Sequence, residues 1–171
     1  MATPTTLPAA FVAGDVLTAA QQNALRGAFR VLQVVQATYG SEVSSSSVTP
    51  ADTGLTATIT PSATSSKILV IVNQSGVQKT AGNAGNAVSL AIVRGATTIH
   101  QFATGVGYTN STLIVTDAVS ATYLDSPSTT SATTYKTVFN NSLGSVAAVG
   151  VQKSVGAGVP VSTITLMEIS A

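Results

Sequence analysis

The chain lacks most of the side chains on which enzymatic and metal chemistry depends. It contains no cysteine and one histidine, His100, among 171 residues. There is therefore no disulfide framework and no zinc–thiolate site, and any Ser–His–Asp or Cys–His arrangement would have to use His100. We interpret His100 as a strand residue that is exposed or packed at an interface. The alternative is a metal or anion site formed by three copies on a symmetry axis.

Charged residues are also scarce. They make up 8% of the chain, against roughly 25% in ordinary soluble proteins. Seven Lys and Arg against six Asp and Glu leave a formal charge of +1, without the basic cluster that nucleic-acid binding requires. Chains with few charges and little net charge tend to associate. We therefore predict a permanent oligomer or a part of a larger assembly, and no nucleic-acid partner.

Long apolar runs are missing as well. No stretch approaches the roughly 18 consecutive apolar residues of a membrane-spanning helix. The N-terminal residues 1–15 hold no lysine or arginine and no long apolar core. These features predict no membrane insertion, no signal peptide and no export by the usual secretory route.

The candidates for catalysis are few. No serine lies in a G-x-S-x-G elbow, and the glycine-rich stretches lack the lysine of a phosphate loop. Asp117 and Asp125 are the nearest pair of acids for glycoside hydrolysis, which requires carboxylates about 5–10 Å apart. However, Asp125 precedes Ser126-Pro127, a sequence typical of a turn. We expect no enzymatic activity, no cofactor and no metal site, with a polysaccharide hydrolase as the remote alternative.

The strongest pattern that is present is a pair of strands between residues 53 and 72. The first alternates apolar residues with threonine, whereas residues 68–72 are apolar at every position. A strand that is apolar on both faces needs a cover on both. One face, either residues 68, 70 and 72 or Leu69 and Ile71, is expected to fill the core. The other, for which we favour Leu69 and Ile71, is expected near a subunit contact or under a helix.

Short strand patterns separated by turn residues continue to the C-terminus. They span residues 54–60, 67–74, 86–94, 97–104, 111–122, 132–140, 145–152 and 162–169. Strands of this length and number predict a mainly β fold, an antiparallel β-sandwich (jelly-roll-like) of about eight strands.

One N-terminal α-helix is expected before these strands. Thr18 fits its N-cap position and Gln21 follows three residues later, as in a capping box. One apolar stripe at helical spacing consists of Leu25, Ala28, Phe29, Leu32 and Val35. We expect residues 1–37 to form an arm and helix that attach or trimerise the protein, and residues 38–171 to form the β-sandwich domain. A helix that only covers one end of the sandwich is the alternative.

Aromatic side chains leave carbohydrate binding open. Tyr108, Tyr123, Tyr135 and Phe139 could stack on sugar rings, with neighbouring amide side chains as hydrogen-bond partners. The alternation of Tyr135, Thr137 and Phe139 along one strand more often indicates core packing.

A set of short motifs covers most of the chain. They are TLP at 6–8, VLTAAQQNAL at 16–25, TGLT at 53–56, ITP at 59–61, SSKILV at 65–70, YLDSP at 123–127, YK at 135–136 and ITLMEI at 164–169. Together these motifs resemble small structural proteins of tailed bacteriophages, of the kinds called minor tail, tail-fibre-like or head-fibre proteins.

The resemblance implies a non-enzymatic virion component, commonly a homotrimer, with an N-terminal attachment segment and a β-rich outer domain. Its partners would be further copies of itself and other phage capsid or tail proteins. It would be made in the host cytoplasm and lie on the particle surface. A module that binds a host cell-surface glycan is the alternative. The candidate receptor-facing residues, in loops 82–86, 105–110 and 126–131, are Asn83, Asn86, Tyr108, Asn110 and Ser128.

Overall fold

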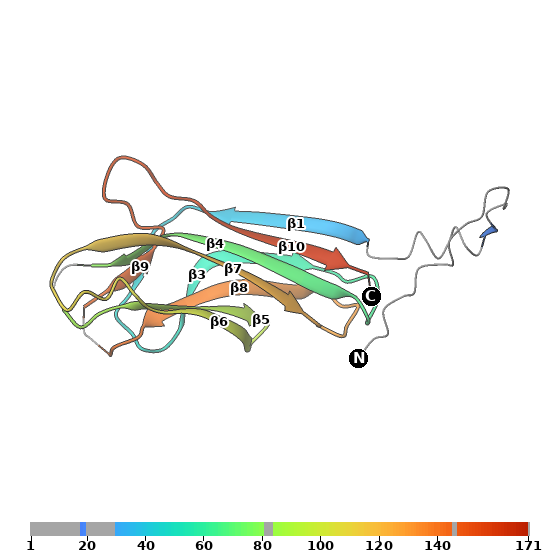
Figure 1. The fold of residues 1–171 in the computed structure, drawn as a ribbon, viewed down its shortest axis with the longest axis horizontal. Helices are drawn as coiled ribbons and strands as arrows, with labels where there is room; N and C mark the ends of the chain where they lie inside the picture. The colour runs from blue at the N-terminus through green and yellow to red at the C-terminus, as the bar shows by residue number, and fades with distance from the viewer. Residues whose placement is uncertain (1–17, 20–29, 81–83, 145–146, 171) are drawn as a thin grey trace, which may run out of the picture.

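The computed structural model describes residues 18–19, 30–80, 84–144 and 147–170, and the residues from 30 onward form two antiparallel β-sheets that face each other (Figure 1). Ten strands build them: β1 Val31–Tyr39, β2 Val43–Ser45, β3 Ala51–Ile59, β4 Lys67–Lys79, β5 Val88–Arg94, β6 Thr97–Val106, β7 Val115–Asp125, β8 Thr133–Asn141, β9 Val149–Val151 and β10 Ser162–Ile169. The predicted mainly β architecture of two antiparallel sheets is confirmed.

The first sheet is centred on β4. Along one edge, β4 pairs first with β10 and further along with β9. Strand β10 pairs in turn with β1, and β9 with β2. Strand β7 pairs with the other edge of β4. The second sheet has the order β3-β8-β5-β6. Strands that follow each other along the chain therefore often lie in different sheets, and the chain repeatedly crosses the core.

The core has two apolar parts with a polar bridge beside them. Ile68, Val70 and Val72 of β4 are fully buried in the larger part, and Phe139 is fully buried in the smaller part. The bridge is a chain of buried hydrogen bonds: Thr53 and Thr137 share a hydroxyl contact of 2.5 Å, Thr137 donates to Gln74 Oε1, and the amides of Gln74 and Gln152 donate to Ser162 Oγ. Because their partners stand on both sheets, these bonds help to fix how the sheets align.

The predicted helix is wrong from residue 31 onward. Residues 31–39 form strand β1, so Leu32 and Val35 lie on a strand and not on a helical stripe. The segment VLQVV is rich in β-branched residues, and β10 offers it a complete pairing partner, so tertiary pairing overrides the helical periodicity. Ala19 is helical, and the other stripe residues, Leu25, Ala28 and Phe29, lie outside the described residues.

The β fold consequently includes residues 31–37, which the sequence pattern assigns to the attachment segment. Each of the eight predicted strands overlaps one of the observed strands, and β1 and β2 were not predicted. Strand β2 falls in a serine-rich stretch that indicates a loop. It forms because residues 43–45 pair with β9.

Candidate assembly surface and the two loop ends

The first sheet carries a row of apolar side chains on the face that points away from the second sheet. We call this face, formed by β1, β10, β4 and β7, the outer face. The strand registers place Val34 opposite Met167, Met167 opposite Leu69, and Leu69 opposite Leu124. With strands about 4.8 Å apart, this apolar row crosses all four strands over about 14 Å.

The apolar row is open to solvent in the single chain. Val34 and Leu124, at its two ends, are each 56% exposed, and Ile71 in the neighbouring row is 38% exposed. Most other outward-facing side chains are uncharged and polar, with threonine the commonest, and Lys67 at the border is the one charged residue among the outward positions of these four strands. A solvated sheet face usually carries several charges, and this face carries one.

Strand β4 resolves the two options left open by its sequence. Residues 68, 70 and 72 are fully buried and fill the sandwich, whereas Leu69 and Ile71 point outward. A contact between Leu69 or Ile71 and a second subunit stays a prediction.

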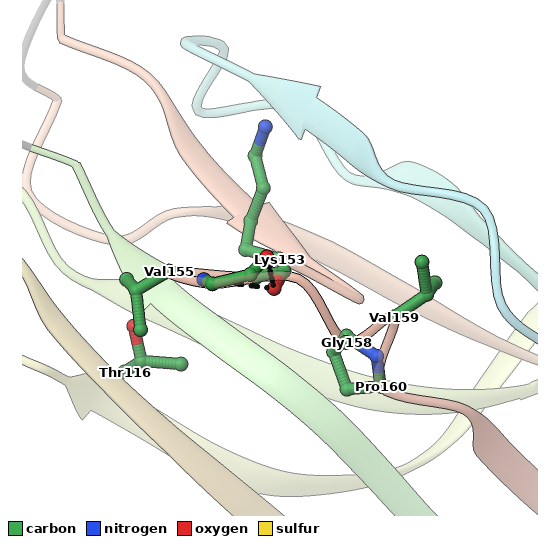
Figure 2. Close-up of a pocket in the computed structure, with 8 residues that line it drawn as sticks. Thr116, Lys153, Val155, Gly158, Val159 and Pro160 are labelled. Carbon is green, nitrogen blue, oxygen red and sulfur yellow. Dashed lines mark hydrogen bonds between the residues drawn. The ribbon is translucent and has the colours of Figure 1, made fainter.

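The loop between β9 and β10 lies at the end of the outer face that is far from the start of β1 (Figure 1). An open cavity of about 420 Å³ lies against it, with Val155 near Thr116 of β7 on one side and Val159 and Pro160 on the other (Figure 2). The base of the loop is held by Glu42, which accepts hydrogen bonds from Lys153 Nζ at 2.9 Å and the Ser154 backbone N–H at 3.0 Å. The lysine and the backbone donor lower the pKa of Glu42.

The three candidate receptor-facing loops do not lie together. Lys79 pairs with Val115 at one end of the β4–β7 ladder, and Ile68 pairs with Asp125 at the other, about 35 Å away by strand rise. The loops after β4 and before β7 therefore share one end of the sandwich. The loop that contains Ser128 lies at the opposite end, where β1 begins.

The buried ammonium group of Lys79 ties the two loops of the first end together. It donates to the carbonyl oxygen of Ala84 at 3.3 Å, to Thr109 Oγ1 at 2.8 Å and to the carbonyl oxygen of Ser111. Sequence reasoning gave Lys79 no role. Its position at the end of a strand in a charge-poor chain was the only available signal.

Asn86 is wrongly predicted as a receptor-facing residue. Its side chain is fully buried and donates hydrogen bonds to the carbonyl oxygens of Thr80 and Ala148. These hydrogen bonds join the two ends of the loop after β4 and connect it to the segment before β9. Tyr108 and Asn110 are exposed at this end and Ser128 is exposed at the other, whereas Asn83 lies outside the described residues.

Asp117 and Asp125 cannot act as a pair of catalytic carboxylates. They stand eight residues apart on one strand, β7, which separates them by about 26 Å, well beyond the roughly 5–10 Å that glycoside hydrolysis needs. Asp117 is exposed and accepts a hydrogen bond from the neighbouring backbone N–H of Ala118.

Asp125 is a buried structural acid and not a turn residue. Its carboxylate accepts hydrogen bonds from Arg94 Nη1 at 2.7 and 2.9 Å and from the Tyr135 hydroxyl at 2.7 Å. Burial, followed by the neighbouring carboxylate, raises the pKa of Tyr135. Tyr135 and Phe139 are fully buried, which confirms that they pack in the core.

His100 lies in β6 and stacks on two rings. Its ring centroid is 4.9 Å from that of Tyr123 in β7 and 6.4 Å from that of Phe102. The contact with Tyr123 joins the edge strands of the two sheets. Within the described ranges no group of three or more His, Cys, Asp or Glu residues is arranged to hold a metal ion.

Comparison with known proteins identifies no family. No protein-family model matches the chain, and no curated protein matches it. Among solved structures, the VP2 subviral particle of infectious bursal disease virus is similar over 80% of this chain, with 16% sequence identity and a TM-score of 0.44. The chain spans 39% of that protein's length. A similarity at this level carries no argument about function.

Among the residues described here, no helix has the length and apolar character needed to cross a membrane.

Proposed function

We propose that the protein is a non-enzymatic structural component of a tailed-bacteriophage particle. It lies on the particle surface as a homotrimeric fibre, spike or decoration, and the residues before β1 attach it. The resemblance of its sequence motifs to phage structural proteins supports the virion assignment. The outer face of the first sheet is the observation that carries the proposal of assembly.

The strand order agrees with a virion role. Without the short β2 and β9, the eight long strands numbered along the chain run 1-8-3-6 in one sheet and 2-7-4-5 in the other. This is a jelly roll, an architecture that viral capsid proteins share with lectins and cupins. Because proteins of unrelated function share this fold, the fold alone does not indicate the function. The assignment of function therefore depends on the outer face of the first sheet.

The outer face favours a second copy of the same chain as its cover. A face of apolar and uncharged polar side chains, with Lys67 at its border, offers no charge pattern for a partner of opposite sign. It is complementary to another uncharged face, and the contact is then driven by burial of apolar area. The low charge of the whole chain acts in the same direction.

The test is the mass of the full chain in solution, measured by light scattering for the wild type and for Leu124→Ser. The wild type is expected as a trimer. The Leu124→Ser variant is expected to dissociate at concentrations at least tenfold higher, because it removes one end of the apolar row. Its fold should be unchanged, since Leu124 is 56% exposed in the single chain.

Leu113→Ser is the matched control. Leu113 is an equally apolar side chain, 67% exposed, but it lies in the loop before β7 and not on the outer face. The proposal of assembly through the outer face is wrong if the wild type is a monomer, or if both variants weaken association equally. Deletion of residues 1–29 tests attachment separately, because particle incorporation should be lost while the trimer persists.

A receptor-binding module for a host glycan is the second candidate. It is favoured by Tyr108, which is 51% exposed beside the exposed Asn110 in a loop that Lys79 holds in place. An exposed aromatic ring on a preorganised loop is suited to stacking on a sugar. Loss of glycan binding in Tyr108→Ala, with the oligomer intact, would support this function.

A further inference from the structure

A second cavity lies at the end of the sandwich where β1 begins. It has a volume of about 330 Å³, and its lining includes Arg94 from the end of β5, Pro127 and Thr129 from the loop after β7, and Ala132 and Thr134. Cavities of a few hundred Å³ are the usual size for small-ligand sites. This cavity is part of neither the hypothesis of catalytic carboxylates nor the assembly proposal.

The side chain of Arg94 is anchored by hydrogen bonds that involve only some of its N–H donors. Nη1 donates to both oxygens of Asp125 and to the carbonyl oxygen of Ser126, and the guanidinium group also interacts with the Tyr135 hydroxyl. A guanidinium group has five N–H donors, and the hydrogen bonds to Asp125 and Ser126 use only those on Nη1. The side chain is 30% exposed and lines the cavity, so part of the guanidinium group is accessible to a ligand.

The support of Arg94 is rigid. Asp125 is 6% exposed, and its Oδ2, which accepts from Arg94, also accepts from the Tyr135 hydroxyl. These hydrogen bonds anchor Nη1, so part of the side-chain entropy of Arg94 is already lost before a ligand binds its free edge.

A second cation lies next to this pair. Lys67 Nζ donates to Ser126 Oγ at 2.7 Å, and Ser126 is the residue whose carbonyl oxygen contacts Arg94. Two cations and one carboxylate thus meet around Ser126. The local excess of positive charge favours an anion, and the planar edge of a guanidinium group binds a carboxylate with two parallel hydrogen bonds.

We propose that this cavity binds the carboxylate of an acidic sugar, such as a single uronic acid unit. Arg94 takes the carboxylate, and the ring lies against Pro127 and Ala132 with threonine side chains around it. The volume exceeds what a bare acetate-sized anion needs and is adequate for one sugar ring. This proposal stands apart from the assembly proposal, because the residues that line the cavity are not on the outer face and Lys67 lies only at its border.

The experiment is a titration of the full chain with glucuronate, with glucose and acetate as comparisons, followed by NMR chemical shifts or calorimetry. Glucuronate is expected to bind in the millimolar range, at least tenfold more tightly than either glucose or acetate. Arg94→Lys keeps the charge and the partner Asp125 but lacks the free edge, so its affinity for glucuronate should fall about tenfold. Ala132→Phe fills the cavity without touching the ion pair and should abolish binding.

Lys136→Gln is the matched control, because Lys136 is 31% exposed and paired with Asp52 beside a separate cavity; the affinity of this variant should not change. The proposal is overturned if glucuronate does not bind, or if Lys136→Gln weakens binding as much as Arg94→Lys. It is also overturned if acetate binds as tightly as glucuronate, because the site would then take simple anions and not a sugar.

Discussion

At the scale of single residues, two fully buried charged side chains are held without an opposite charge. Lys79 donates only to carbonyl and hydroxyl oxygens. Glu168 accepts from the Gln33 amide at 2.6 Å and from the backbone N–H and hydroxyl of Ser62 at 2.7 and 2.6 Å. A buried charge is tolerated when several dipoles replace its water, so both residues organise the segments around them.

Glu168 makes the stability of the fold sensitive to acid. Burial opposes ionisation, but the hydrogen bonds from Gln33, Ser62 and Ser66 outweigh it and lower the pKa from 4.5 to about 2. A carboxyl with a lowered folded-state pKa contributes stability above its unfolded pKa and loses it as the pH falls through the folded value. The contribution is therefore complete above about pH 5 and disappears between pH 4.5 and 2.

Urea unfolding of the wild type and Glu168→Gln at several pH values measures this contribution. At pH 7 the variant is expected to be less stable by about 2 kcal/mol, because a neutral amide replaces a carboxylate that accepts several hydrogen bonds. The difference should shrink steadily below pH 4.5. A difference that stays constant down to pH 2.5 would show that the charge of Glu168 contributes nothing.

At the scale of elements, β3 is bent to admit a ring from β1. Gly54 has a φ of +87°, and its register with β8 shifts between Asp52 and Thr56. A Cβ atom at position 54 would lie 2.3 Å from the ring of Tyr39. Glycine is therefore required at position 54 for two reasons: its backbone conformation and the space that the Tyr39 ring occupies.

Gly54→Ala should lower the free energy of unfolding by about 3 kcal/mol or more, since the left-handed backbone costs roughly 1 kcal/mol and the clash adds to it. Gly95→Ala is the control, because Gly95 has a φ of +58° with nothing within 4 Å of the added Cβ. It should cost only about 1 kcal/mol. Equal losses in thermal or urea unfolding would mean that Tyr39 moves aside freely.

At the scale of the whole molecule, three pairs of opposite charges meet within the described part of one chain. Arg94 pairs with Asp125, Lys136 with Asp52 and Lys153 with Glu42. The outer face is left almost uncharged, with Lys67 at its border. Under the proposed assembly, the contact between copies is then an apolar one.

Association through such a face should be insensitive to salt. Raising NaCl from 0.1 to 1 M screens charges over about 3 Å and strengthens apolar contacts slightly. The dissociation constant of the trimer is therefore expected to stay constant or to fall. A tenfold rise, measured by light scattering or sedimentation, would indicate an interface held by charges instead.

The sequence by itself determined the class of fold and the position of most strands. Period-two patterns and turn residues act locally, so strands such as β4 and β10 are visible in the chain alone. The run of apolar residues at 68–72, apolar on both faces of the strand, marked β4 as central. Association, which composition indicated, stays a prediction.

Only the tertiary structure decided which residues meet. Residues 31–37 are compatible with a helix and became β1 because β10 pairs with them. Cross-strand register places Val34, Met167, Leu69 and Leu124 in one row, although they are distant in sequence. The same non-local pairing buries Asn86 and separates the loop of Ser128 from that of Tyr108. Such contacts depend on register between distant strands, which no local pattern encodes.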